Sequence, residues 1–411
     1  MKQNKINRRV FIKMASGAVA TLGLSTGTLS MLSRKSSASD SLDDPRVIVV
    51  SDQNAHSGSQ ISAEIAQVMM DEAIRQYTGI TDIGAAYQSV LPDITANSVI
   101  GIKVNCINSL CPTHPVVVNA LINGLLQMNF VGNPFPANNI IIWDRSSWSL
   151  QYSGYTINSG TTGVRCFGTN TVGYSSTTLN CAGSSQHPSN ILTNYCDFLI
   201  DFAVMKNHDT AGVTFTMKNH LGSIHNPSGL HGGYCDPYVP ALNQQIRDVL
   251  DVQESLHIVD AIFGIYYGGP SGSPNMIYDG IILGEDRVAV DAVGRQILDD
   301  CGCSTIYRAT HIDTAAAVPY NLGTANLNNI EIINIMNPSI AVQNLEVTRS
   351  HSDIVLRWST PEYTGQIKVL RSTVPDFTTF DELAIMNGNT YTDSGVLPSN
   401  HKYFYRVLKT W

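Results

Sequence analysis

The sequence predicts an α/β fold with a mostly parallel sheet, flanking helices and a small C-terminal all-β sandwich. Two observations predict the larger part: short β-branched runs alternate with stretches of helical apolar spacing, and this alternation continues from about residue 45 to 325. A third predicts the sandwich, because strands of alternating polarity follow one another from about residue 338. At 411 residues the chain is also too long for one ordinary core.

The first half of the α/β region contains three strand patterns with helices between them. Strands are expected at 46–51, 98–105 and 139–144, and helices at 61–77 and 115–128. Parallel strands separated by helices end at the same edge of a sheet, where polar residues gather into a crevice. Residues in such positions are Lys103, Asn105, Asp144 and Arg145.

A loop-rich insert is expected at about 146–190, where Ser, Gly, Thr, Tyr and Asn dominate. Regular elements then resume. Asp286 is placed to cap the last of the helices, and Gly302 is placed to end it. The expected elements are strands at 195–205, 255–266 and 277–283 and helices at 239–250 and 286–301.

The C-terminal region has alternating strands with Thr, Asp, Ser and Gly turns between them. The strand with Leu356, Arg357 and Trp358 and the strand at 403–407 resemble those of a fibronectin type III module. The resemblance implies that residues 338–411 form a β-sandwich. Such modules serve more often as spacers or adhesion units than as catalysts.

Residues 1–38 are expected to be a targeting segment and no part of the fold. Arg8 and Arg9 precede Phe11 and a weakly apolar run over 14–32, which resembles a twin-arginine export signal. The alternative is a membrane anchor, but the run is short and contains three glycines. The resemblance implies the twin-arginine export machinery as partner, no stable membrane anchor, and a periplasmic or extracellular location.

Charge excludes one class of partner. The first 38 residues hold seven of the 25 basic residues and no acid, so the remaining chain has 18 basic residues against 33 acidic ones, a net charge of −15. Binding to nucleic acid or to an anionic membrane releases counterions from a basic surface, which this chain does not offer. We therefore expect no nucleic-acid partner.

The eight cysteines permit disulfides in an exported protein. Cys166 with Cys181 is the first candidate pair, because they bracket an insert with little core potential, and Cys106 with Cys111 is the second. Their spacing fits no iron–sulfur motif. The sequence also contains no P-loop, no dinucleotide-binding glycine pattern and no nucleophile elbow, so a nucleotide cofactor is not expected.

The segment over 206–236 concentrates two Lys-Asn pairs and four histidines among turn residues, and it predicts a loop that forms the wall of a site. A lysine there can bind an anion, act as a base or nucleophile, or pair with a carboxylate. The histidine spacings of twelve, five and six residues match no standard zinc pattern, but a divalent metal site stays open. The candidate catalytic residues are Lys206, His208, Lys218 and His231, and the candidate metal ligands are His208, His220, His225 and His231.

Five motifs in order resemble the domain of unknown function 362 family over roughly residues 45 to 320. The first two are the runs at 102–105 and 142–144, and the third is Lys206-x-His208 with Lys218-Asn219 and Gly222. The fourth is the run at 258–261 with Gly269-Pro270, and the fifth is the run at 283–292. The resemblance implies an α/β domain with a shared polar site and does not imply a reaction. The expected ligand-binding residues are Lys103, Asn105, Asp144, Asn207, Asn219 and Asp260.

The leading functional hypothesis is an exported enzyme that binds a small anionic substrate with these lysine, asparagine and histidine side chains, with a possible metal ion. One alternative is a non-catalytic carrier of a metal or cofactor. Another is a surface binding protein that uses the β-sandwich. The alternative for each residue is a structural role without contact to a ligand. A lone buried lysine usually pairs with a carboxylate, and a lone loop histidine usually forms only hydrogen bonds within the protein.

Overall fold

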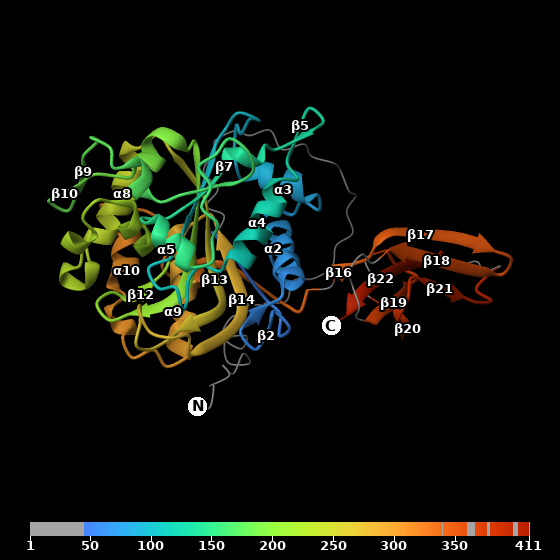
Figure 1. The fold of residues 1–411 in the computed structure, drawn as a ribbon. Coiled ribbons are helices and arrows are strands. Elements are labelled where there is room, and N and C mark those ends of the chain that lie inside the picture. Colours follow the sequence, from blue (N-terminus) through green and yellow to red (C-terminus); the bar gives the residue numbers. More distant parts are fainter. Residues whose placement is uncertain (1–44, 339, 360–365, 376–378, 398–401, 411) are drawn as a thin grey trace. The chain divides into compact units, whose positions relative to one another are not determined.

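The computed structural model describes residues 45–338, 340–359, 366–375, 379–397 and 402–410. The chain divides into two compact units, residues 1–336 and 337–411 (Figure 1). The export signal expected over residues 1–38 lies outside the described residues. Within the described part, no helix has the length and apolar character needed to cross a membrane.

A nine-stranded sheet forms the centre of the first unit. Five of its strand pairs are parallel, whereas β14 is antiparallel to both of its neighbours and β12 is antiparallel to β11. The predicted mostly parallel sheet is therefore confirmed. The strand order is β15 (Glu331–Met336), β1 (Arg46–Ser51), β14 (Met276–Gly284), β13 (Gln253–Ile265), β11 (Phe198–His208), β4 (Ile100–Val104), β7 (Ile140–Trp143) and β8 (Arg165–Cys166), with β12 (Gly212–Thr214) beside β11.

Both faces of the sheet are buried under helices, as Figure 1 shows. Alternate residues of a strand point to opposite faces, so Ile48 and Val50 enter one core and Val47 and Val49 the other. This is why the strands are apolar throughout. One core is covered by α2 (Ala63–Thr78), α3 (Ile83–Ser89) and α4 (Pro115–Leu125), and the other by α7 (Thr216–Asn219), α8 (Tyr238–Val249), α9 (Arg287–Asp300) and α10 (Thr310–Ala316).

Two long helices begin at residues that the sequence marks. Asp286 accepts hydrogen bonds from the backbone N–H groups of Val288 and Ala289 at 2.8 and 2.9 Å, so the predicted cap of α9 is confirmed. Ser62 caps α2 by accepting from Ile65 N, and Gly79 ends that helix with φ of 72°. The caps satisfy backbone groups that a helix end leaves open.

The insert and the remaining connections consist of short elements. Short helices and strands lie between the loops of residues 146–190, and β8, which was not expected, joins the central sheet parallel to β7. The elements are α5 (Ser147–Tyr152), α6 (Thr169–Val172), a π-turn (Ile191–Tyr195), and the hairpins β9–β10 (Leu179–Cys181, Ser184–Gln186), β2–β3 (His56–Ser57, Gln60–Ile61) and β5–β6 (Asn129–Phe130, Asn133–Pro134).

All eight cysteines are unpaired, and seven of the eight thiols have raised pKa values because of burial. The first candidate disulfide is wrong because Cys166 lies in the core under α2 and α4 whereas Cys181 lies in the core on the opposite face of the sheet. Cys106 and Cys111 are also free, and each is buried in a different apolar cluster.

Residues 206–224 are largely buried in a strand, a helix and a turn, which corrects the loop prediction for this part, whereas 225–236 form mostly exposed or half-buried turns. β11 continues through Lys206 to His208 because this end pairs with β12. Every residue of α7 is buried. Three short 3₁₀ turns follow, at His220–Ser223, Pro227–Leu230 and Gly232–Cys235.

The second unit contains small antiparallel sheets only, within its described residues. Leu356, Trp358, Ile367, Val369 and Val407 form its buried cluster. One sheet has the order β16 (Ile340–Ala341), β22 (Phe404–Thr410), β19 (Gln366–Ser372) and β20 (Asp381–Met386), and the other β17 (Gln343–Ser350), β18 (Asp353–Ser359) and β21 (Thr390–Asp393).

Candidate functional site

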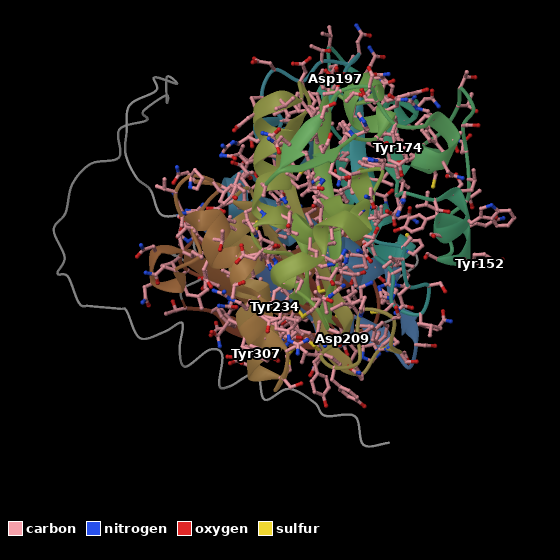
Figure 2. The ribbon with its side chains drawn as sticks, turned by 90° about the vertical axis from the view of Figure 1, so that its left-hand side faces the viewer. Tyr152, Tyr174, Asp197, Asp209, Tyr234 and Tyr307 are labelled. Atoms are coloured by element: carbon pink, nitrogen blue, oxygen red, sulfur yellow. The ribbon has the colours of Figure 1, made fainter. Side chains whose placement is uncertain are left out.

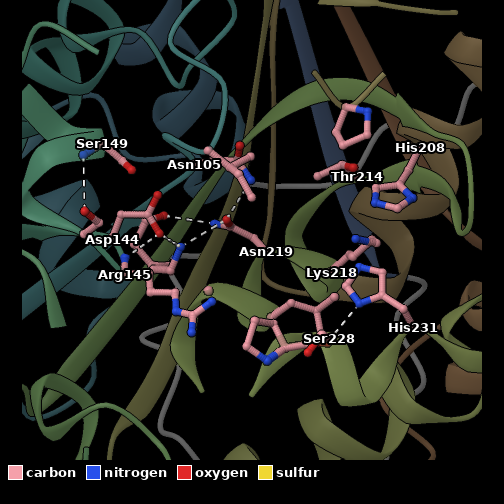
Figure 3. Close-up of a pocket in the computed structure, with 17 residues that line it drawn as sticks. Asn105, Asp144, Arg145, Ser149, His208, Thr214, Lys218, Asn219, Ser228 and His231 are labelled. Carbon is pink, nitrogen blue, oxygen red and sulfur yellow. Dashed lines mark hydrogen bonds and ion pairs between the residues drawn. The ribbon is translucent and has the colours of Figure 1, made fainter. Parts of the chain in front are cut away.

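A cavity of about 610 Å³ lies at the carboxyl ends of β4, β7 and β11. Lys103 comes near the end of β4, Asp144 follows β7 directly, and His208 is the last residue of β11. Lys218 and Asn219 of α7 form another wall, as Figure 3 shows. The other lining residues are Asn105, Ile107, Arg145, Ser146, Ser149, Thr214, Leu221, Gly222, Pro227, Ser228, His231 and Pro270.

A buried ion pair forms one wall of this cavity. Lys103 Nζ lies 2.8 Å from Asp144 Oδ1, and it also donates to Val104 O and to Asn219 Oδ1. Asp144 Oδ2 in turn accepts from the backbone N–H of Cys106 at 2.7 Å. A buried charge that is paired and hydrogen bonded on all sides is satisfied. Lys103 and Asp144 therefore hold the shape of the wall and offer a ligand little net charge.

Lys206 lies behind the cavity wall. Its Nζ donates to Asn105 Oδ1 at 2.7 Å and to Cys111 O at 3.1 Å, and the side chain is fully buried. Burial lowers its pKa. Asn105 Nδ2 then donates to Asn219 Oδ1 at 3.1 Å. The structure does not bring Lys206 to the cavity surface, so the expectation that it acts on a ligand is corrected: it orients Asn105.

Lys218 differs from Lys103 and Lys206, the other two lysines in the described part of this unit. Its side chain is 6% exposed and lines the cavity, and among the described residues no carboxylate or carbonyl oxygen accepts a hydrogen bond from its Nζ. Burial lowers the pKa of Lys218 to about 8; Cys235 opposes the shift and the Lys206 charge adds to it. A buried cation without a counter-charge is costly and favours an anion beside it.

His208 and His231 stand near this amine with their ring centroids 5.7 Å apart. Figure 3 shows both rings beside the end of Lys218. His208 Nδ1 accepts from the N–H groups of Thr210 and Ala211, so a neutral ring carries its proton on Nε2. His231 Nδ1 donates to Pro227 O at 2.9 Å, which leaves an unprotonated Nε2. The two rings thus offer one donor and one acceptor.

Burial, followed by the Lys218 charge, lowers the pKa of His208 to about 3. The same two causes lower the pKa of His231, against a hydrogen bond to Pro227 that raises it. Both rings are therefore neutral near neutral pH, which is the state that the hydrogen bonds describe. A neutral donor beside a neutral acceptor is suited to moving a proton in either direction.

Two contacts from distant parts of the chain position these groups. Asp291 of α9 accepts from Thr216 N, Thr216 Oγ1 and Met217 N at 2.9, 2.6 and 3.1 Å, and so fixes the start of α7. Arg308 donates to the carbonyl of Asp209 in the turn after His208, and its guanidinium lies over the rings of Tyr234 and Tyr307. Figure 2 shows Asp209, Tyr234 and Tyr307 at the same end of the unit.

The four histidines proposed as metal ligands do not converge. His220 Nε2 lies 2.8 Å from Glu254 Oε1 in a buried network, and His225 Nδ1 accepts from the backbone N–H of His187. Only His208 and His231 line the cavity. Within the described residues, no three His, Cys, Asp or Glu side chains are arranged to hold a metal ion. The four-histidine site is wrong because their strand, turn and helix positions point them in different directions.

Two of the expected ligand-binding residues also lie away from the cavity. Asn207 is buried, and its Oδ1 accepts from Gly269 N at 2.8 Å, so it anchors the loop that brings Pro270 to the cavity. Asp260 pairs with His114 Nδ1 at 2.7 Å on β13, which is separated from β4 by β11. Asn105, Asp144, Asn219 and Lys103 do line the cavity, as expected.

Sequence reasoning missed three features of the site. Arg145 was placed at a strand end but was not chosen; it lines the cavity, and its Nη2 donates to His225 O. Thr214 belongs to β12, a strand of three residues that is too short to show a strand pattern in the sequence. His311 of α10 is fully buried, and neither of its ring nitrogens has a hydrogen-bond partner in the described structure. Burial and the Lys218 charge lower the pKa of His311 to about 3.

Fold and site together define an α/β protein with a cavity at the carboxyl edge of its parallel strands, lined in part by charged and polar side chains. Residues 100–296 match the model of the family described as Domain of unknown function (DUF362), which supports that family for this part of the chain. No curated protein matches the sequence.

One comparison with solved structures found a crystal structure of a protein from Thermotoga maritima, a structural genomics target. It shares 11% sequence identity with a TM-score of 0.35, and the match covers 59% of this chain and 60% of that chain. This chain thus spans less than two thirds of that protein. The likeness carries no argument about fold or function.

Proposed function

We propose that the α/β unit is an enzyme that binds a small anionic substrate in the cavity, with Lys218 as the principal anion-binding group. The supporting observation is a lysine that is almost fully buried, lines the cavity and has no counter-charge among the described residues. Arg145, exposed at the same cavity, offers a second cation. A ligand anion would complete the hydrogen bonds that Lys218 lacks.

In this proposal His231 and His208 exchange protons with the bound substrate. His231 Nε2 is the acceptor and His208 Nε2 the donor, because the backbone holds each ring by its Nδ1. The role of Asn105 is to present its second amide N–H to the ligand, with Lys206 holding its oxygen from behind. Asn219, whose amide is fully used by Lys103, Asp201 and Asn105, holds Asn105 in place. In this proposal the residues that bind the anion, those that shape the cavity wall and those that transfer protons are different residues of one cavity.

Titration with inorganic phosphate tests the anion site. We expect the wild-type protein to bind phosphate and the Lys218→Met protein to bind it about 10- to 100-fold more weakly, because a hydrogen bond to a charged group contributes roughly 1.5–3 kcal/mol. Arg75→Gln is the matched control: it removes one positive charge from exposed α2, away from the cavity. Equal phosphate affinity in all three proteins, measured by calorimetry, would contradict the proposal.

A second variant tests the cavity itself. A Cβ on Gly222 would lie 2.9 Å from Lys103 Nζ and 3.0 Å from Asp144 Oδ1. Gly222→Ala is therefore expected to displace this ion pair into the cavity, to lower phosphate affinity about 10-fold, and to cost about 1–3 kcal/mol of stability through overpacking. Unchanged affinity in a folded Gly222→Ala protein, measured by the same titration, would mean that the ligand lies elsewhere.

Two further proposals concern the rest of the chain. We propose that residues 338–411 are a fibronectin type III-like sandwich that acts as a spacer or adhesion unit; the antiparallel sheets and the cluster around Trp358 support it. Phosphate affinity that falls when this unit is deleted would count against a spacer role.

We also propose twin-arginine export, which predicts that the N-terminus of the secreted protein lies after residue 38.

A further inference from the structure

The three lysines among the described residues of the α/β unit have different surroundings. Lys103 and Lys206 each donate hydrogen bonds to nearby oxygen atoms. Lys218 has no such acceptor among the described residues, although it is buried and faces the cavity. An amine in these surroundings loses its proton readily, and a neutral lysine amine is a nucleophile toward carbonyl carbon.

We propose that Lys218 forms a covalent imine with a small carbonyl compound that carries an anionic group. This inference rests on the proposed function, since it uses the same cavity, and it goes further by naming the class of substrate. The charged form of Lys218 attracts the anionic compound into the cavity; Arg145 then holds the anionic group while the neutral form of Lys218 meets the carbonyl carbon. The cavity of about 610 Å³ is large enough for a compound of this kind.

The step balances with the residues present. The nitrogen lone pair of Lys218 attacks the carbonyl carbon, a C–N bond forms, and the C=O electron pair moves to oxygen. The nitrogen then loses a proton to His231 Nε2, and the oxygen takes a proton from His208 Nε2. These two transfers give a carbinolamine. Its hydroxyl takes the proton from His231, the C–O bond breaks while the nitrogen lone pair forms the C=N bond, and water leaves. The protonated imine gives its remaining N–H proton to His208 Nε2, so both rings return to their starting state and the imine remains. Amine and carbonyl compound give imine and water, so no oxidant or reductant is needed.

The two rings are placed for these transfers. Their centroids lie 5.7 Å apart, and the Lys218 charge acts on both. His208 and His231 are locked in opposite tautomers by the backbone, so the donor and the acceptor are not interchangeable. The pKa of Lys218, lowered to about 8, leaves roughly a tenth of the amine neutral at pH 7, compared with well under a thousandth for an exposed lysine.

Reductive trapping tests the proposal on the full chain. The protein is incubated with pyruvate and sodium cyanoborohydride, which reduces an imine to a stable secondary amine, and the modified lysines are located by peptide mass spectrometry. We expect Lys218 to be labelled at least about 10-fold more than Lys368 and Lys402, which report the background of the C-terminal unit in the same sample. Lactate, which has the same charge but a hydroxyl group in place of the keto group, should give no adduct.

Labelling of Lys218 that does not exceed that of Lys368 and Lys402 overturns the inference. If phosphate binding still depends on Lys218, the proposed anion site stands without the imine; if neither adduct nor phosphate binding is found, both proposals fail. Because the wild-type protein is mapped, the result does not depend on the folding of a variant.

The role of the histidine has its own control. His231→Gln is expected to slow adduct formation on Lys218 by about 10-fold or more, because the proton acceptor is lost. His351→Gln removes an exposed histidine of the second unit and should leave the rate unchanged. Equal rates in these two variants contradict the assignment of His231.

Discussion

Lys218→Met is expected to raise the free energy of unfolding by about 3 kcal/mol near neutral pH while it weakens anion binding. Burial lowers the pKa of Lys218 from 10.5 to about 8, and each pKa unit corresponds to about 1.4 kcal/mol. Methionine has a similar volume and carries no charge to desolvate. A gain in stability together with a loss of binding would indicate that the lysine is retained for function.

The pH dependence gives the sign of this effect. Because the folded-state pKa of Lys218 is lower than the unfolded one, the unfolded chain binds more protons between pH 8 and 10.5. The stability cost of Lys218 is therefore fully present below about pH 8 and disappears as the pH rises to 10.5. Denaturant unfolding of both proteins measures it: the difference between variant and wild type should shrink over this range. A difference independent of pH would contradict a buried, uncompensated amine.

Glu254→Ala is expected to destabilise the protein by about 3–5 kcal/mol. Glu254 Oε2 lies 2.6 Å from Arg287 Nη1, its Oε1 lies 2.8 Å from His220 Nε2, and its side chain is 3% exposed. Burial opposes its ionisation, but Arg287 and His220 outweigh burial and hold the pKa of Glu254 below its usual value. Removing the carboxylate leaves the Arg287 charge buried without a partner.

Chemical denaturation with two controls checks this prediction. Asp313→Ala breaks the ion pair between Arg295 and an exposed carboxylate and should cost less than about 1 kcal/mol. The double variant Glu254→Ala/Arg287→Met removes both charges and should recover part of the loss. A cost for Glu254→Ala as small as that for Asp313→Ala would mean that the network adds little. Because the pKa of Glu254 is lowered, its contribution should be lost as the pH falls below 4.5.

Local sequence patterns predicted most of the elements of the α/β unit, because their causes are local. Ser62, Gly79 and Asp286 mark helix ends by satisfying nearby backbone groups. The neighbours of each strand are set by distant residues. Val47 pairs with Gly284 on one side and with Ile332 on the other, and no feature of 46–51 specifies either partner. The antiparallel β14 between β1 and β13 was therefore not predictable from local pattern.

The arrangement of the site also depends on residues that are distant in the sequence. Lys206-Asn207 and Lys218-Asn219 are alike in sequence, yet one lysine is covered by Asn105 and the other faces the cavity. The difference arises because Asp291, far along the chain, holds the start of α7. The histidine-rich composition was a weaker guide than the strand-end position of Lys103, which did lead to the cavity.

An anomalous-scattering anion soaked into crystals of the protein tests the central claim most directly. Selenate resembles phosphate in shape and charge, and its selenium can be located without bias. We predict a selenate within about 3 Å of Lys218 Nζ inside the cavity, the distance of a charge-assisted hydrogen bond. A cavity without selenate in crystals whose exposed arginines bind it would contradict the account.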